Sequence, residues 1–287
     1  MNQPAYPPVV PPPATRPPRR PWLRAVVVAW GVLLAGLIVW SVRHDPPTVP
    51  EQSDIAAALP FLNAATGALM SAADADGRAV VLHPTEFSRD CRLTPVRPGV
   101  EAVREVTLRV RAGGAGPALD AIAQALPAGY QARVRRSPSG TRLELYADAG
   151  GFVAIDARTP ADATVLTLHV STGCRPLAAG VNLTPTSPPA SAVPAAYGAA
   201  LRALGAAGAD AGTVTEVACP AGGTARTVTS EAVPVPQDLG RALQPVTAGA
   251  GVVQAEPRAW AWRSGAVSVV VTRTDGTARV SATTGCR

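Results

Sequence analysis

Residues 171–175 read STGCR, and residues 283–287, the last five of the sequence, read TTGCR. Before each copy the sequence passes through the same kinds of segment in the same order: an apolar helix, a β-rich run ending at a cysteine, a strand, a second helix and a group of strands. We therefore expect an α+β fold of two tandem small units, each with its helices on one face of a sheet. The units span residues 55–175 and 194–287. Residues 176–193 have the Pro, Ser and Thr content of a linker.

The apolar pattern predicts the elements of the first unit. Leu62, Ala65 and Leu69 recur on one face of a helix expected at 60–73. Residues 104–111 alternate between Val or Leu and polar residues, which predicts a strand with apolar side chains inward and charged or polar ones outward. A helix at 116–127 and four strands follow.

The second unit repeats this order with low sequence identity. Its helices are expected at 194–207 and 234–246, with a β-run ending at Cys219 before the second of them. Residues 274–277 place Asp-Gly between two alternating runs, which is a strong hairpin signal because glycine tolerates positive φ.

The sequence has four cysteines, two in each expected unit. An even number outside the cell indicates disulfides, and four cysteines allow three pairings. Duplication of a unit with two cysteines favours Cys91–Cys174 and Cys219–Cys286. Each such closure would stabilise the fold by about 4 to 5 kcal/mol in the chain-entropy description. No two cysteines have the close spacing of zinc sites or of C-x-x-C redox motifs.

Residues 25–42 carry no charged side chain and are bounded by Arg24 and Arg43. As a helix they would be about 27 Å long, which is close to the hydrocarbon thickness of a bilayer. Trp22 and Trp40 would lie at the two interfaces. The following residues, SVRHDPP, offer no small-x-small cleavage site, so we expect an uncleaved signal anchor.

The charges that flank this segment predict its orientation. Four arginines precede it, whereas acidic residues follow Arg43, so the N-terminus is expected in the cytoplasm and the C-terminus outside the plasma membrane, in a single-pass arrangement. Residues 1–24 form a Pro-rich tail expected to be disordered, with a docking ligand for a cytoplasmic partner as the alternative. Residues 43–54 read as a short stiff stalk.

The net charge of +6 does not indicate a nucleic-acid-binding protein. Arg16, Arg19, Arg20 and Arg24 supply four of the 26 cationic residues, so 22 remain after them against 20 acidic residues. A surface so close to neutral has no sustained electrostatic footprint for phosphate backbones.

Recognisable catalytic motifs are missing: the sequence has no G-x-S-x-G, H-E-x-x-H, Walker loop or dinucleotide fingerprint. We expect no cofactor, and no metal site because His44, His83 and His169 lie far apart in the sequence. Residues 113–116, GGAG, precede a helix and could hold an anion, but a flexible strand-to-helix connection is favoured.

Acidic pairs fall in expected loops and are interpreted as exposed charges rather than catalytic carboxylates. These pairs are Asp74 with Asp76, and Glu86 with Asp90.

Arg258, Trp260 and Trp262 share one face of an expected strand. In a protein with 4% aromatic residues, two such rings make a candidate ligand-binding platform for a sugar or a peptide. The alternative, which we favour, is that they are large residues of a core otherwise made of Val and Ala.

These features favour a non-enzymatic, membrane-anchored binding or structural module of the cell envelope. It would contact the lipid bilayer through residues 25–42 and bind an envelope protein or a cell-wall ligand. One alternative is a sensory or regulatory single-pass membrane protein whose Pro-rich tail binds a partner. A secreted-side hydrolase is the second alternative and lacks a recognisable nucleophile and base. The layout resembles that of secreted, single-anchor envelope proteins, and this resemblance identifies no functional residue.

Overall fold

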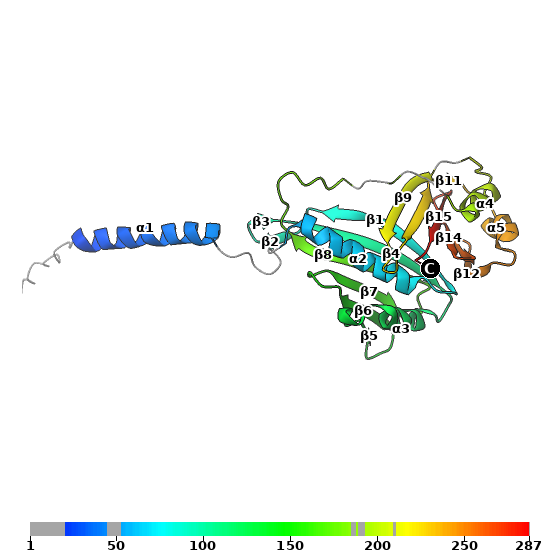
Figure 1. The fold of residues 1–287 in the computed structure, drawn as a ribbon, viewed down its shortest axis with the longest axis horizontal. Helices are drawn as coiled ribbons and strands as arrows, with labels where there is room; N and C mark the ends of the chain where they lie inside the picture. Colours follow the sequence, from blue (N-terminus) through cyan, green and yellow to red (C-terminus); the bar gives the residue numbers. More distant parts are fainter. Residues whose placement is uncertain (1–20, 45–52, 185–187, 189–192, 209–210, 287) are drawn as a thin grey trace, which may run out of the picture. The chain divides into compact units, whose positions relative to one another are not determined.

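The structure, a computed structural model, describes residues 21–44, 53–184, 188, 193–208 and 211–286. The chain forms two compact units, residues 1–47 and residues 48–287. The second unit, called the body below, contains two disulfides and many antiparallel strands. The fold is mixed α+β with more sheet than helix (Figure 1).

The first unit contains the helix α1 (Pro21–His44), whose 24 residues span about 36 Å. Residues 22–41 are long and apolar enough to cross a membrane. The described side chains from Trp22 to Trp40 are exposed, as expected of a helix that has no protein core around it. The helix extends beyond the expected 25–42 and includes residues 21–24 of the expected tail. The rest of that tail lies outside the described residues.

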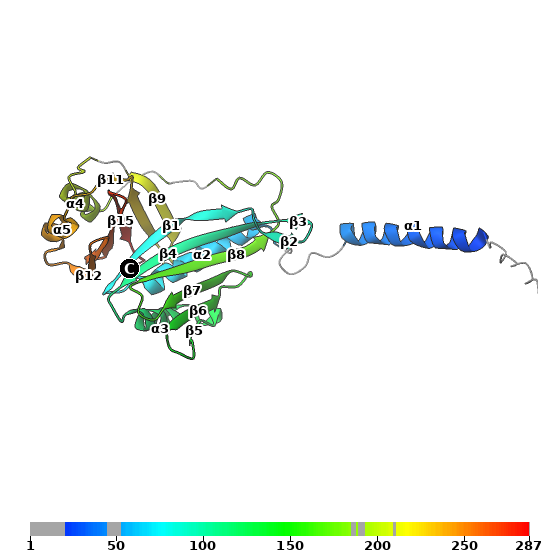
Figure 2. The same ribbon diagram turned by 180° about the vertical axis from the view of Figure 1, so that it is seen from behind.

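The first sheet of the body has six antiparallel strands in the order β1-β4-β8-β7-β6-β5. Figures 1 and 2 show α2 and α3 on the same face of this sheet, where their apolar side chains form the largest core cluster. The elements of this part are α2 (Ile55–Ala73), β1 (Arg78–Ser88), β2 (Arg92–Thr94), β3 (Arg97–Pro98), β4 (Val100–Val110), α3 (Ala115–Ala125), the 3-10 turn η2 (Ala128–Tyr130), β5 (Arg133–Arg136), β6 (Arg142–Asp148), β7 (Ala154–Pro160) and β8 (Val165–Arg175).

The second sheet has the order β12-β13-β14-β15-β10-β9, and β11 pairs with β15 at one end. The helices α4 and α5 pack on one of its faces around a second core cluster. The elements of this part are α4 (Ala195–Ala203), β9 (Ala211–Ala218), β10 (Thr224–Ser230), β11 (Val233–Pro234), α5 (Leu239–Thr247), β12 (Gly251–Glu256), β13 (Ala259–Ser264), β14 (Val267–Thr274) and β15 (Thr277–Thr284).

The two sheets are connected in the same way. In each, the first strand is an edge strand that pairs with the second, the second pairs with the last, and the remaining strands form a meander that ends at that last strand. A helix precedes the first strand, and another follows the second. The elements before and after residues 176–193 thus have the same connection order.

The two sheets do not form separate bodies, because β1 of the first sheet packs on the second. Ala79 and Val81 point away from the helices of their own sheet and contact Val253, Ala261 and Val270 in a small buried cluster. The face of the second sheet opposite α4 and α5 is therefore covered by the first sheet.

The helix α2 begins earlier than expected. The Asp54 side chain accepts a hydrogen bond from the Ala57 N–H at 2.9 Å, which caps the helix so that it starts at Ile55 with Pro60 inside it. Ser53 and Asp54 thus belong to the body, and the expected stalk is shorter at that end. The helices α3, α4 and α5 are shorter than expected: α5, for example, begins only after its own capping residue, Asp238.

The described part of the expected linker packs against the body. Val181 and Leu183 contact the core under the first sheet, and the Pro176 carbonyl accepts a hydrogen bond from the Ile55 N–H at 3.0 Å. This segment therefore contributes apolar contacts to the body in addition to joining its two sheets.

Candidate functional site

Both expected disulfides are present. Cys91 bonds Cys174, and Cys219 bonds Cys286, with Cα atoms 5.7 and 5.5 Å apart. Cys91 follows the first strand of its sheet, and Cys174 lies in the last strand; Cys219 and Cys286 follow the corresponding strands of the second sheet. The two bridges thus close equivalent ends of the two sheets.

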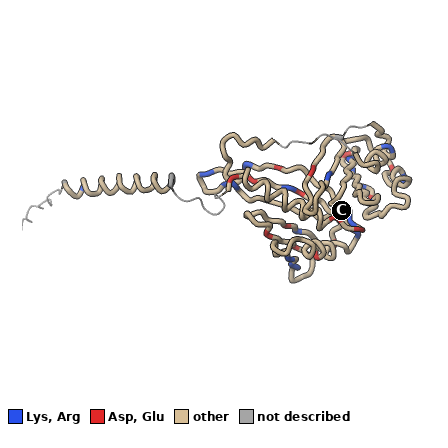
Figure 3. Tube along the Cα trace, in the orientation of Figure 1, with Lys and Arg blue, Asp and Glu red and all other residues tan. Residues whose placement is uncertain are grey.

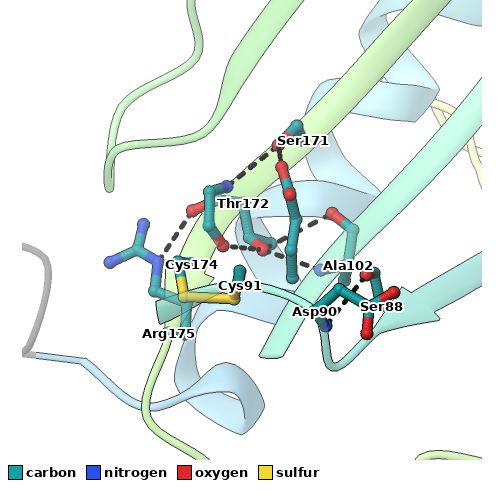
Figure 4. Close-up of a disulfide and its surroundings, with 10 residues drawn as sticks. Ser88, Asp90, Cys91, Ala102, Ser171, Thr172, Cys174 and Arg175 are labelled. Atoms are coloured by element: carbon teal, nitrogen blue, oxygen red, sulfur yellow. Dashed lines mark hydrogen bonds between the residues drawn. A yellow bond between two sulfur atoms is a disulfide. The ribbon is translucent and has the colours of Figure 1, made fainter. Parts of the chain in front are cut away.

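The first copy of the repeated motif fixes the end of β8 (Figure 4). The Thr172 hydroxyl accepts a hydrogen bond from the Ala102 N–H of β4 at 3.0 Å, next to the Cys91–Cys174 bridge. Arg175 is 1% exposed and donates to the Gly151 carbonyl at 2.6 Å and to the Ser53 hydroxyl at 3.0 Å. Its guanidinium also lies 5.6 Å from the centre of the Phe152 ring. This copy of the motif, residues 171–175, therefore has a structural role in holding the end of β8.

The second copy joins the two sheets as well as closing its own. The Thr283 hydroxyl shares a hydrogen bond of 2.8 Å with Thr227, whose hydroxyl accepts from the Leu82 N–H of β1 at 3.0 Å. Gly285 lies so close to Asp74 that a Cβ atom there would be 1.7 Å from the carboxylate. A side chain at position 285 would therefore push the C-terminal segment away from the end of α2. Arg287 lies outside the described residues.

The favoured interpretation of Trp262 as a core residue is confirmed, which leaves no two-Trp ligand platform. That ring is 1% exposed and packs in the core between the second sheet and its helices, where no ligand can stack on it. Trp260 is half-buried at the same core, against Gly240 of α5. Arg258 precedes β13 and lines a separate cavity with Arg273 and Asp275. Burial of large apolar rings in a core of small residues explains this arrangement.

The interpretation of Asp74 as an exposed charge is wrong. Asp74 is 5% exposed, and its Oδ1 lies 2.5 Å from Nη1 of Arg263 in β13. The same nitrogen donates to the Ser268 hydroxyl at 3.2 Å. Asp76, Glu86 and Asp90 are exposed, as expected. The Asp74–Arg263 pair is a buried ion pair that joins the end of α2, which packs on the first sheet, to β13 of the second sheet.

A second buried arginine also crosses between the sheets. Arg109 of β4 donates to the Gln254 side chain of β12 at 2.6 Å. Burial lowers the Arg109 pKa, and the nearby Glu256 carboxylate partly opposes this effect. Its position on the outer face of β4 predicted exposure to solvent, but the second sheet covers that face.

Arg104, also on β4, occupies the opposite face, toward α2. It is 5% exposed and donates to Asn63 Oδ1 at 3.0 Å, to the Glu216 carbonyl of β9 at 2.6 Å, and to the His83 carbonyl at 3.4 Å. Burial lowers the pKa of its guanidinium to about 10, so the group stays cationic at neutral pH. The expected outward position of this residue is wrong: the alternation that places Val106 inward places Arg104 inward too.

Arg104 lines a cavity of about 610 Å³ between the two sheets. Its walls come from α2, from β1 after its bulge, from β9 and from the described part of the linker. The other lining residues are Leu59, Asn63, Pro84, Thr85, Phe87, Asn182, Leu183, Thr184, Pro188, Thr213, Val214, Thr215 and Glu216. A cavity of this size that combines apolar walls with a few polar groups is typical of small-molecule sites.

Sequence reasoning missed this cavity because its walls are separated by more than 150 positions. The sequence held two signals for it. Arg104 occupies a position in β4 whose side chain points inward, and Pro84 interrupts the alternation of apolar and polar residues in β1. Along the described part of the body's chain trace, arginine positions and acidic positions are interspersed (Figure 3).

His83 accepts a hydrogen bond from Arg104 through its backbone carbonyl, while its imidazole ring has other contacts. Nε2 of His83 is 2.9 Å from the Thr107 hydroxyl and 3.8 Å from Glu105. Within the described residues, no three His, Cys, Asp or Glu side chains are grouped to hold a metal ion.

Comparison with protein-family models, with curated proteins and with solved structures finds no match to this chain in any of the three.

Proposed function

We propose that the chain is a membrane-anchored, non-enzymatic binding module of the cell envelope, with its N-terminus in the cytoplasm and its body outside the plasma membrane. The apolar helix α1 would be the anchor. Two disulfides support an oxidising, extracytoplasmic location for the body, because such bonds are rare in the cytosol. The arginines before α1 support the orientation through the positive-inside rule.

The body would have arisen by duplication of one α+β unit. The shared connection order of the two sheets, the equivalent positions of the bridges and the repeated motif all support this origin. Duplication leaves two equivalent sheets, and packing one against the other creates a space that neither has alone.

The observation that carries the binding proposal is the cavity at Arg104, whose walls come from both sheets. Residues 213–216 of β9 line one side, and α2 and β1 line the other. Buried polar contacts between the sheets, including Asp74–Arg263 and Leu82–Thr227, hold these walls in fixed positions. Preorganised walls reduce the entropy that a ligand must overcome on binding.

The test is photocrosslinking in living cells. A photoreactive benzoylphenylalanine at position 213, on the cavity wall, should give a discrete adduct with an envelope component. The same residue at position 141, an exposed turn away from this cavity, is the matched control. No adduct from position 213, or the same adducts from both positions, would contradict binding at this cavity.

A further inference from the structure

The charge of Arg104 is unusual for its surroundings. The residue lies among Ala102, Val106 and Leu108 on the inward face of β4, where an apolar side chain would be the least costly choice. Burying a guanidinium without a counter-charge costs several kcal/mol. An arginine at such a costly position is a candidate for a role that uses its charge.

All three hydrogen-bond acceptors of Arg104 are neutral: one amide oxygen and two backbone carbonyls. Burial is also the cause of its lowered pKa, with no carboxylate acting in the other direction. The Glu216 carboxylate lines the same cavity, but it forms an ion pair with Arg226 of β10. Within the described residues, Arg104 therefore has no carboxylate partner.

The guanidinium of Arg104, which lines the cavity, has spare hydrogen-bonding capacity. Arginine carries five N–H groups, and the three hydrogen bonds leave two for a ligand. The three existing bonds fix the plane of the group, so its remaining donors are held in place before a ligand arrives. Charge-assisted bonds from arginine to a carboxylate are among the stronger ones in proteins.

The walls restrict the ligand to a single negative charge. Among the described lining residues, Arg104 is the one cation and Glu216 the one anion. A dianion such as phosphate would carry one negative charge more than Arg104 can neutralise. Leu59, Phe87 and Leu183 supply apolar surface for the rest of the ligand.

We propose that this cavity binds a small organic monocarboxylate, with its carboxylate on Arg104 and its apolar part against Leu59, Phe87 and Leu183. This assignment rests on the proposed binding function and names its ligand class. The volume of about 610 Å³ accommodates a ligand of one or two rings or a short acyl peptide.

The experiment uses the full chain in lipid nanodiscs and 4-benzoylbenzoate as a photoreactive probe. We expect saturable labelling of residues 59–63, 82–88, 181–184 or 213–216, identified by peptide mass spectrometry. Excess benzoate should reduce this labelling, whereas benzamide, the neutral analogue, should not. Equal competition by benzamide, or labelling confined to other segments, would overturn the proposal. Equal competition by inorganic phosphate would overturn the monocarboxylate assignment in favour of a general anion site.

The matched variants are Arg104→Gln and Arg135→Gln, the latter on an exposed arginine of β5. Loss of a charge-assisted hydrogen bond should weaken labelling roughly tenfold or more in Arg104→Gln. Arg135→Gln should label like the unmodified chain, and equal labelling of Arg104→Gln would count against the site. If Arg104→Gln does not fold with both disulfides, the test is the difference in competition between benzoate and benzamide on the unmodified chain.

The pH dependence of labelling distinguishes a carboxylate bound by Arg104 from a carboxylate bound by a histidine side chain. The Arg104 pKa of about 10 keeps the guanidinium charged between pH 6 and 9, and the probe's carboxyl, with a pKa of about 4, is ionised there too. Labelling should therefore be constant over this range, and a loss between pH 6 and 8 would contradict the role of Arg104. If crosslinking at position 213 succeeds in cells while 4-benzoylbenzoate fails, the ligand class is wrong and the binding function stands.

Discussion

Asp74 at the end of α2 and Arg263 in β13 form a buried ion pair, with Oδ1 and Nη1 2.5 Å apart across 189 positions of sequence. Gly285 lies against the same carboxylate, so the end of the chain closes over the pair. This contact, together with Leu82–Thr227 and Arg109–Gln254, makes the two sheets one body. The body's cavity exists only while the sheets stay in this arrangement.

Breaking the ion pair should destabilise the body strongly. Asp74→Ala leaves the Arg263 charge buried without its carboxylate partner, so we expect a loss of about 3 to 5 kcal/mol in the free energy of unfolding. Denaturant titration followed by Trp fluorescence measures this. Asp120→Ala is the control, because Asp120 pairs with Arg136 on the surface and should cost less than about 1 kcal/mol. Similar losses in the two variants would contradict the role given to Asp74.

Two helix glycines should respond to alanine in opposite directions. A Cβ at Gly67 of α2 would lie 2.1 Å from the Ala218 carbonyl oxygen of β9, so Gly67→Ala should push these elements apart and lower the melting temperature. A Cβ at Gly116 of α3 would meet nothing closer than 3.8 Å, so Gly116→Ala should stabilise by up to about 1 kcal/mol. Thermal melts of both variants check the prediction, and a stabilising Gly67→Ala would show that α2 does not approach β9 so closely.

Each disulfide should contribute separately to stability. The bridges span 83 and 67 positions, and removing either by paired Cys→Ala substitution should cost about 4 to 5 kcal/mol in the chain-entropy description. Peptide mapping without reductant should recover Cys91 with Cys174 and Cys219 with Cys286. A Cys174–Cys219 link would contradict the equivalence of the two sheets.

Trp262 and Trp260 should differ in their contributions to stability. Trp262→Ala removes a fully buried ring and should cost about 3 to 5 kcal/mol, while Trp260→Ala should cost clearly less because that ring is half-buried. Neither substitution should change labelling by 4-benzoylbenzoate in protein that remains folded. A loss of labelling in Trp260→Ala alone would restore the idea of an aromatic ligand platform.

Much of the order of elements could be predicted from the sequence. The repeated motif and the cysteine positions predicted both disulfides, and the alternation of residues 104–111 predicted β4. Helix bounds were less accurate, since a capping residue such as Asp54 decides them more than the apolar periodicity does.

The packing of the two sheets could not be predicted from expected elements treated separately. Its signal was local: residues 79–82, AVVL, are all buried and do not alternate, which is typical of a strand covered on both faces. Asp74, Arg104 and Arg109 were expected at the surface because they are charged. Their buried partners lie on elements far away in the sequence, so no local pattern reveals that these three residues are buried. The cavity depends on those long-range contacts and has no motif of its own.

The most direct test of the central claim, an anchored chain with its body outside the cell, is site-specific proteolysis on intact cells. A protease recognition sequence is inserted between residues 48 and 49, and, in a second variant, before residue 20. Added protease should release the disulfide-bonded body from the first variant and cut the second only after the membrane is permeabilised. Cleavage of the second variant alone on intact cells would reverse the orientation, and a body released without any protease would show that α1 does not anchor the chain.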